Sequence, residues 1–358
     1  MSMTDAQAIQ GKVFFVTGTM RSGTSLLSDL LYSRLTRTRR HPDIVFSMEG
    51  MPTFRHGLMM LRNSKPYRAS VQDPAWLPTF GRTVDVGEVT VSNHDELAME
   101  MVRQLRERLA SVTRCPIEAM TRFGVKYTGI RNEFLLFREQ FPDARLVVMV
   151  RDPRDVVAYH KFRTLSQPPT RNLSIIHDIL NMARFAEHHV DDPTVLVLRY
   201  EDLVADQRGQ MERVLTFLDL DPNAYDWASV DKGLLSNSSF GDDAPGGRVK
   251  VVPGVAAASS RYKRYLSASE VQMVELLTAP VMRRFGYTPE DHGDLSLPAT
   301  SVLATYLPLV VRSGHSINDN LSALRVVAEA GDFENLLDTV LTQIASEAEA
   351  GAQTASAD

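Results

Sequence analysis

Residues 16–27, with the sequence VTGTMRSGTSLL, decide the fold class of this chain. Gly18 and Gly23 stand at the spacing of the phosphate-binding loop G-x-x-x-x-G-K-[ST], and Ser25 fills its last position, but Thr24 replaces the lysine. Such a loop points several backbone N–H groups at one spot, where the dipole of the following helix favours negative charge. The stretch therefore predicts a site for a phosphate-like anion, and it raises the question of which anion does not need the lysine.

Short apolar runs flanked by turn residues predict the strands of a parallel sheet. KVFFVT at 12–17 precedes the loop, and leucines at helical spacing follow it, so this unit is expected to run strand, loop, helix. Similar runs occur at 145–150 (RLVVMV) and 195–200 (VLVLRY), with helical patterns at 173–189 and 206–218. This alternation predicts an α/β fold, a P-loop-like three-layer sandwich with a central parallel sheet and helices on both faces.

Three polar residues are expected to meet at one edge of that sheet. Ligands of parallel sheets bind at the carboxyl ends of the strands, and Arg21, Arg151 and Tyr200 all lie at or just beyond such ends. Two other charged residues that follow the middle strand, Arg154 and Asp155, are typical of a solvated ion-pair cluster. The first three are therefore candidates for binding the anion, and the last two are not.

Composition excludes several classes of protein. The 358 residues carry 39 Lys and Arg against 44 Asp and Glu, and a net charge of -5 argues against a surface that binds nucleic acid. The single cysteine, Cys115, excludes an internal disulfide and a cysteine-based metal site. No segment reaches the roughly 18 apolar residues of a membrane span. We expect a soluble, cytoplasmic protein that binds neither nucleic acid nor membrane.

Three motifs in a fixed order carry a family resemblance. RSGTSLL is followed by FPDARLVVMVRDPRDVVAY, and then by LRYEDL and a helix that ends in FLDL. This combination resembles the sulfotransferases that use 3′-phosphoadenylyl sulfate (PAPS), and within them the bacterial and tyrosylprotein-type branch. The resemblance implies in-line transfer of a sulfuryl group from PAPS, without a metal, to a hydroxyl or less often an amine. The acceptor is expected to be a small molecule or a peptide, and adenosine 3′,5′-bisphosphate (PAP) is left.

The resemblance covers residues 12–287 and shapes the expected domain organisation. A flexible N-terminus at 1–11 precedes a sulfotransferase domain at 12–289. Two amphipathic patterns after it predict a helical appendage at 290–348, which either caps the core or forms a homodimer contact. The last residues, 349–358, have the composition of a disordered tail.

The resemblance also implies which residues bind the donor. The residues expected around the 5′-phosphosulfate are Arg21, Ser22, Gly23, Thr24 and Ser25. Arg151 is implied at the 3′-phosphate with Arg163 as a second contact, and Tyr159 stands where the family places a serine. Tyr200, and Arg261 in SSRYKRYL, are implied near the nucleotide. From the residues alone, Tyr200 is equally typical of a core tyrosine with a satisfied hydroxyl.

Sulfuryl transfer also needs cations beside the bridging oxygen of the leaving group and an in-line geometry. The resemblance implies the first role for Arg21 and for Lys126 in FGVKYTG, although a lone lysine is commonly just exposed. Ser238 or Ser239, in NSSF, is the candidate hydroxyl near the sulfuryl group.

A general base must take the proton of the acceptor. In the cytosolic branch of the family a histidine does so, and Thr128 occupies that position here. The stretch RRHPDIVFSMEG resembles the tyrosylprotein-type segment in which a glutamate follows HPD, so Glu49 is the expected base, with His41 and His94 as alternatives.

Two other functions share parts of this pattern. A phosphotransferase that uses ATP shares the loop, but it needs the missing lysine and a magnesium-binding carboxylate. Asp152, directly after Arg151, leaves such a carboxylate open. A nucleotide-binding scaffold without catalysis is the third alternative, and Tyr159 in place of a serine favours it.

Overall fold

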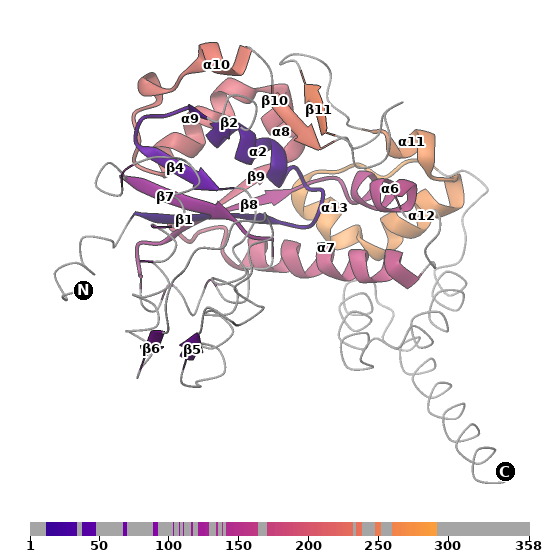
Figure 1. Cartoon of the computed structure of the whole chain (residues 1–358). Helices are drawn as coiled ribbons and strands as arrows, with labels where there is room; N and C mark the ends of the chain where they lie inside the picture. Colours follow the sequence, from indigo (N-terminus) through magenta and orange to yellow (C-terminus); the bar gives the residue numbers. More distant parts are fainter. Residues whose placement is uncertain are drawn as a thin grey trace, which may run out of the picture. The chain divides into compact units, whose positions relative to one another are not determined.

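The structure is a computed structural model (Figure 1), and it describes most of the sheet-forming core and the helices around it. The described residues are 12–33, 38–47, 67–69, 89–91, 121–128, 141–163, 170–231, 234–237, 248–251 and 260–291, together with the single positions 103, 107, 110, 116, 134 and 138. The expected N-terminal segment 1–11, appendage and tail lie outside the described residues, apart from the first two residues of the appendage. The described residues fall into two compact units. The first unit holds those within Met1–Arg151 and His188–Ala258, and the second unit holds those within Asp152–Glu187 and Ser259–Asp358.

A five-stranded parallel sheet forms the centre of the first unit (Figure 1). Its strands, in spatial order, are β4 (Ile44–Ser47), β7 (Arg122–Lys126), β1 (Val13–Gly18), β8 (Arg145–Val150) and β9 (Val195–Arg199). Each neighbouring pair is parallel, and the register places Val16 of β1 opposite Lys126 and Gly18 opposite Met149. The three strands predicted from the sequence, β1, β8 and β9, are neighbours in this sheet, and β1 is the central strand of the five. The α/β fold class is confirmed.

Side chains of β1 alternate between two covered faces of the sheet, because successive residues of a strand point to opposite sides. Phe14 stacks on Phe46 with ring centroids 5.6 Å apart. Phe15 meets the edge of Phe134, a residue in helical conformation, at 6.2 Å. Every residue of β1 is buried, which explains why the sequence of this strand is a continuous apolar run and not an alternating one.

Helices of the first unit cover one of these faces. They are α2 (Thr24–Leu31), α8 (Tyr200–Ala205), α9 (Gln207–Phe217) and α10 (Trp227–Asp231), with a 3₁₀ turn, η3, at Pro222–Ala224. Leu27 and Leu30 of α2 and Val214 of α9 share one apolar cluster with Phe14. The phosphate-loop helix is thus anchored to the sheet by its own leucines.

Three short antiparallel pairs complete the first unit. They are β2 (Tyr32–Ser33) with β3 (Thr38–Arg39), β5 (Tyr67–Ala69) with β6 (Val89–Val91), and β10 (Leu234–Asn237) with β11 (Arg248–Val251). Strand β10 packs beside α2. This contact places the strand that leads toward Ser238 next to the loop helix.

The second unit is helical. Its helices are α6 (Pro153–Arg163), α7 (Thr170–His188, whose last residue belongs to the first unit), α11 (Tyr262–Tyr265), α12 (Ala268–Leu277) and α13 (Ala279–Phe285). α6 packs against α11 and α12. The helical patterns predicted at 173–189 and 206–218 correspond to α7 and α9.

The predicted solvated cluster around Arg154 is wrong, because Arg154 is buried at the start of α6. Its guanidinium binds the carboxylates of Asp152 and Glu275, each at 2.7 Å, and lies 4.4 Å from the centre of the Tyr262 ring. Burial lowers the pKa of Arg154, but these hydrogen bonds outweigh it and raise the pKa above its ordinary value. The carboxylate that the sequence left open for a metal, Asp152, is therefore engaged by an arginine.

The prediction for Asp155 is wrong for the same reason. Its side chain is fully buried, and the carboxylate accepts hydrogen bonds from the backbone N–H groups of Ser260 and Tyr262, both at 3.0 Å. The local sequence could not indicate this, since the partners lie more than 100 residues downstream. Asp155 thus anchors the two residues that flank Arg261.

Within the described residues, no helix combines the length and the apolar character that a bilayer crossing requires.

Candidate functional site

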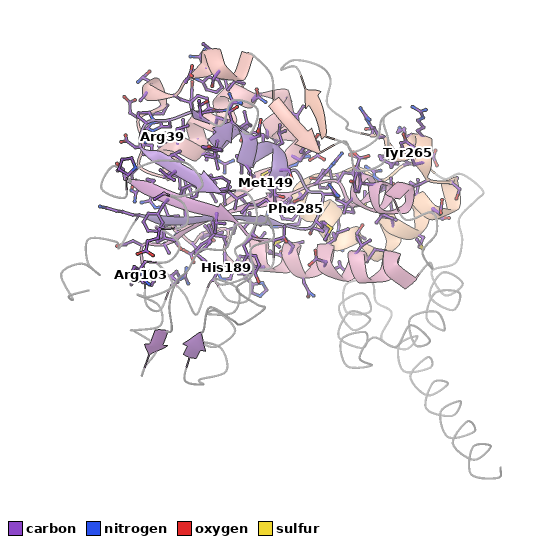
Figure 2. All side chains as sticks on the ribbon, viewed as in Figure 1. Arg39, Arg103, Met149, His189, Tyr265 and Phe285 are labelled. Carbon is purple, nitrogen blue, oxygen red and sulfur yellow. The ribbon has the colours of Figure 1, made fainter. Side chains whose placement is uncertain are left out.

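Backbone geometry explains both glycines of the loop. Gly18 ends β1 with φ +153°, and a Cβ there would lie 2.5 Å from the carbonyl oxygen of Met149, the residue labelled at the centre of Figure 2. Gly23 has φ +104°, and a Cβ there would lie 2.4 Å from Cδ2 of Tyr200. Neither conformation suits a residue with a side chain, so the glycine spacing follows from the tight turn between strand and helix.

The first turn of α2 supplies hydrogen-bond donors to the loop. The carbonyl of Gly23 accepts from the N–H groups of Leu26 (2.9 Å) and Leu27 (3.1 Å), which starts the helix. The N–H groups of Thr24 and Ser25 come before these, and first-turn N–H groups have no acceptor within their own helix. The arrangement is that of an anion site at a helix N-terminus.

The hydroxyl of Ser22 is a second feature that points to a ligand. Ser22 is 1% exposed, and its Oγ has no hydrogen-bond partner among the residues that the structure describes. A buried hydroxyl in this state costs about 1–3 kcal/mol unless something accepts from it or donates to it. A phosphate or sulfate oxygen in the loop would remove that cost.

Arg21 connects the loop to the next strand. Its φ of +78° is uncommon for a residue with a side chain and stores backbone strain. The carbonyl oxygen of Arg21 accepts a hydrogen bond from Nη1 of Arg151 at 3.2 Å, directly after β8. The Cζ atom of Arg151 in turn lies 4.2 Å from the ring centroid of Tyr200, directly after β9. The structure thus brings together the three residues that the sequence predicted to converge.

Lys126 lies at the same edge of the sheet on the other side of β1. It is the last residue of β7 and pairs with Val16. The N–H of Tyr127 donates to the carbonyl of Val16 at 2.9 Å, and the hydroxyl of Thr17 donates to the carbonyl of Thr128 at 3.2 Å. These bonds hold the chain after Lys126 against the strand that leads into the loop.

Three other predicted nucleotide contacts belong to the second unit. Tyr159 is buried in α6, and Arg163 is the last residue of that helix. Arg261 is half-buried at the start of α11, between the two residues that Asp155 holds.

Glu49, His94, Ser238 and Ser239 lie outside the described residues. Of the expected bases, only His41 is described. Its ring is buried just before β4, with Nδ1 accepting from the N–H of Asp43 (3.1 Å) and Nε2 3.0 Å from the carbonyl oxygen of Asp221. Both nitrogens are used and the residue lies at the amino end of its strand, so the geometry gives His41 a structural role and does not favour it as the base.

The fold and the loop define a class of protein: an α/β protein with a glycine-rich phosphate-binding loop between the central strand of its parallel sheet and the following helix. A model described as "Sulfotransferase family" matches residues 14–224, which is more than half of the chain. The chain belongs to the sulfotransferase family. Its reaction is the transfer of a sulfuryl group from PAPS, as the sequence motifs indicated.

The solved structures to which this chain is similar are distant in sequence. The sulfotransferase domain of the olefin synthase from Synechococcus PCC 7002 is 17% identical, with 77% of this chain and 94% of that chain covered and a TM-score of 0.43. Sulfotransferase STF9 from Mycobacterium avium is 14% identical (82% and 80% covered, TM-score 0.40). Mouse sulfotransferase SULT7A1, complexed with PAP, is 14% identical (76% and 85% covered, TM-score 0.39). No curated protein matches this chain.

Sequence reasoning missed two features of the site. The hydrogen bond from Arg151 to the carbonyl of Arg21 carries no signal in the order of residues, because it depends on the register of β1 and β8. The hydrogen bonds that Asp155 accepts from Ser260 and Tyr262 carry no local signal either, because these partners lie more than 100 residues downstream.

Proposed function

We propose that the loop between β1 and α2 binds the 5′-phosphosulfate of PAPS and that Arg151 binds its 3′-phosphate. The observation that carries this assignment is the loop itself. It combines the first-turn N–H groups of α2, the buried hydroxyl of Ser22 and a direct hydrogen bond from Arg151. The roles of Thr24 and Ser25 follow from their place at the start of the helix.

Thr24 in the lysine position suits this donor. In nucleotide triphosphatases the lysine reaches the β- and γ-phosphates, which PAPS does not have. The 5′ end of PAPS carries one phosphate and one sulfate, with less charge than a triphosphate. Backbone N–H groups, hydroxyls and Arg21 supply the hydrogen-bond donors for this smaller charge, and Arg151 is assigned to the 3′-phosphate.

The proposed reaction is an in-line displacement at sulfur. The acceptor oxygen forms a bond to sulfur while the bond from sulfur to the bridging oxygen breaks, and PAP leaves with the bridging oxygen. Arg21 and Lys126 stabilise the negative charge that develops on that oxygen. Glu49 takes the proton of the acceptor, and Ser239 donates a hydrogen bond to the sulfuryl group.

Other roles are proposed from the family resemblance. Tyr159, Arg163 and Arg261 bind the 3′-phosphate side of the nucleotide, and Tyr200 lies beside it. The acceptor is a hydroxyl of a small molecule or of a peptide. The protein acts in the cytoplasm, and the appendage at 290–348 either caps the core or forms a homodimer contact.

Calorimetry with PAP tests the donor site. Wild type is expected to bind PAP, and Arg21→Ala and Arg151→Ala should each weaken it by about ten- to a hundredfold, since a charge-assisted hydrogen bond contributes about 1.5–3 kcal/mol. Arg208→Ala is the matched control, because Arg208 is an exposed arginine that lies over Trp227 in α10. Absence of PAP binding by folded wild-type protein would refute the assignment.

Two further measurements separate the alternatives. A phosphotransferase would bind ATP more tightly than PAP and would lose this preference with EDTA, whereas we expect PAP to displace ATP with or without the chelator. Glu49→Gln should lower the transfer rate at least a hundredfold while PAP affinity stays within about twofold. A Glu49→Gln enzyme with the wild-type rate would remove Glu49 as the base without affecting the donor assignment.

A further inference from the structure

Arg151 makes two contacts within the first unit that do not depend on any ligand. Nη1 donates to the carbonyl oxygen of Arg21 at 3.2 Å, and the guanidinium lies over the ring of Tyr200 at 4.2 Å. Arg151 and Tyr200 are both nearly fully buried, at 5% and 8% exposed. The guanidinium is therefore held in place before the donor binds.

The Arg21 carbonyl belongs to the most strained residue of the loop. A φ of +78° at a residue with a side chain persists only where surrounding contacts enforce it. The hydrogen bond from Arg151 is one such contact. The N–H of the next residue, Ser22, donates to the carbonyl of Thr19 at 3.0 Å and closes the same turn.

Tyr200 contacts the loop at a second point. A Cβ on Gly23 would lie 2.4 Å from Cδ2 and 3.2 Å from Cε2 of the Tyr200 ring, so the ring packs directly on the Cα of Gly23. Gly23 caps α2, whose first-turn N–H groups form the anion site. One aromatic ring thus supports both the arginine and the glycine that shape the loop.

From these contacts we infer that Arg151, supported by Tyr200, is a positioning residue for the 5′-phosphosulfate loop as well as a ligand of the 3′-phosphate. The inference rests on the proposed donor site. In this proposal one guanidinium, that of Arg151, couples the binding of the 5′ end of the donor to the binding of its 3′-phosphate. Tyr200 acts through its ring and not through its hydroxyl. A nucleotide with a 5′-phosphate and no 3′-phosphate should therefore still depend on Arg151.

The test measures binding of adenosine 5′-phosphate, which offers nothing to a 3′-phosphate site. The titration is followed on the Gly23 amide resonance, with PAP as the reference ligand. Arg151→Ala and Tyr200→Leu are each expected to weaken adenosine 5′-phosphate about five- to tenfold, and Tyr200→Phe, which keeps the ring, should lie within about twofold of wild type. Loss of positive charge alone could explain the first variant, but neither Tyr200 variant changes the charge.

A double-mutant cycle decides whether Tyr200 acts through Arg151. If it does, the double variant Tyr200→Leu with Arg151→Ala has an affinity for adenosine 5′-phosphate within about twofold of that of each single variant. If the double variant instead loses affinity by the product of the two single losses, Tyr200 acts on Gly23 alone, and the coupling is overturned. An Arg151→Ala protein that loses affinity for PAP and keeps wild-type affinity for adenosine 5′-phosphate would also overturn it.

Controls keep these outcomes interpretable. Trp227→Leu removes a ring beneath another arginine, Arg208, at 5.2 Å, in α10 of the first unit, and should leave both affinities unchanged. If Tyr200→Leu does not fold, Arg151→Ala with adenosine 5′-phosphate still tests the coupling, because wild-type affinity in that variant would overturn it. Failure of wild type to bind PAP would refute the proposed function, whereas the outcomes above refute only the coupling.

Discussion

Replacing Gly23 by alanine is the sharpest structural perturbation of the loop. A residue with a side chain at φ +104° costs about 1–3 kcal/mol in backbone strain. The new methyl group would also lie 2.4 Å from Cδ2 of Tyr200 and 3.2 Å from Cε of Met149, and relief of such an overlap in a packed region costs about 1–3 kcal/mol. Together these terms predict a loss of about 4 kcal/mol, or a displaced Tyr200 and a distorted loop.

The control is Gly209→Ala in α9 of the same unit. A Cβ there would lie even closer to another atom, 2.2 Å from Oδ2 of Asp206. That atom ends an exposed side chain that caps the helix, so Asp206 can move into solvent at a cost of about 1 kcal/mol, which the higher helix propensity of alanine offsets. We expect almost no change in stability for Gly209→Ala.

The assay is urea unfolding followed by the fluorescence of the two tryptophans, of which Trp227 lies in α10 of the first unit, together with calorimetry with PAP. Gly23→Ala should lower the unfolding midpoint and weaken PAP at least tenfold. The reasoning is refuted if Gly23→Ala matches Gly209→Ala in both stability and PAP affinity.

Two further predictions concern regions away from the loop. Arg154→Met should destabilise the second unit by about 3–5 kcal/mol, because it leaves the carboxylates of Asp152 and Glu275 buried without their partner. The measurement is a urea titration followed by circular dichroism, with Arg208→Met as the control, because a change at this exposed ion pair should alter stability by less than about 1 kcal/mol. Equal effects of the two variants would contradict the buried network. Burial raises the pKa of Asp192, but hydrogen bonds from Thr194 and Arg138 outweigh it and lower the pKa, so its contribution to stability is complete above about pH 4 and is lost as the pH falls through the lowered value. Unfolding midpoints measured from pH 5 to about pH 2 should therefore fall more steeply for wild type than for Asp192→Asn, and parallel curves would show that Asp192 makes no such contribution.

The sequence predicted the parts of the fold that depend on local pattern. Continuous apolar runs identified β1, β8 and β9, because strands covered on both faces need no polar alternation. The glycine spacing predicted the loop, since each glycine answers a local backbone demand. The order of strands then placed Arg21, Arg151 and Tyr200 at one edge.

Contacts between distant segments were beyond such prediction. The local sequence predicts a charged surface stretch at Arg154 and Asp155. Their partners Glu275, Ser260 and Tyr262 come from a segment more than 100 residues downstream, and both side chains are buried. No local pattern distinguishes a solvated charge from one whose partner lies 100 residues away. The strand β4 was missed because it has only four residues, and β7 was missed because Gly124, whose missing side chain leaves room for the ring of Phe14, interrupts its apolar run.

Transfer of labelled sulfate tests the central claim most directly. The 358-residue chain is incubated with PAPS labelled in its sulfuryl group and with a panel of phenols, aliphatic alcohols, amines and tyrosine-containing peptides. The account predicts that label moves to at least one hydroxyl acceptor while PAP forms in equal amount, and that Arg21→Ala abolishes the transfer whereas Arg208→Ala does not. Protein that is folded and binds PAP, but transfers no label to any member of the panel, would contradict it and would favour a nucleotide-binding scaffold.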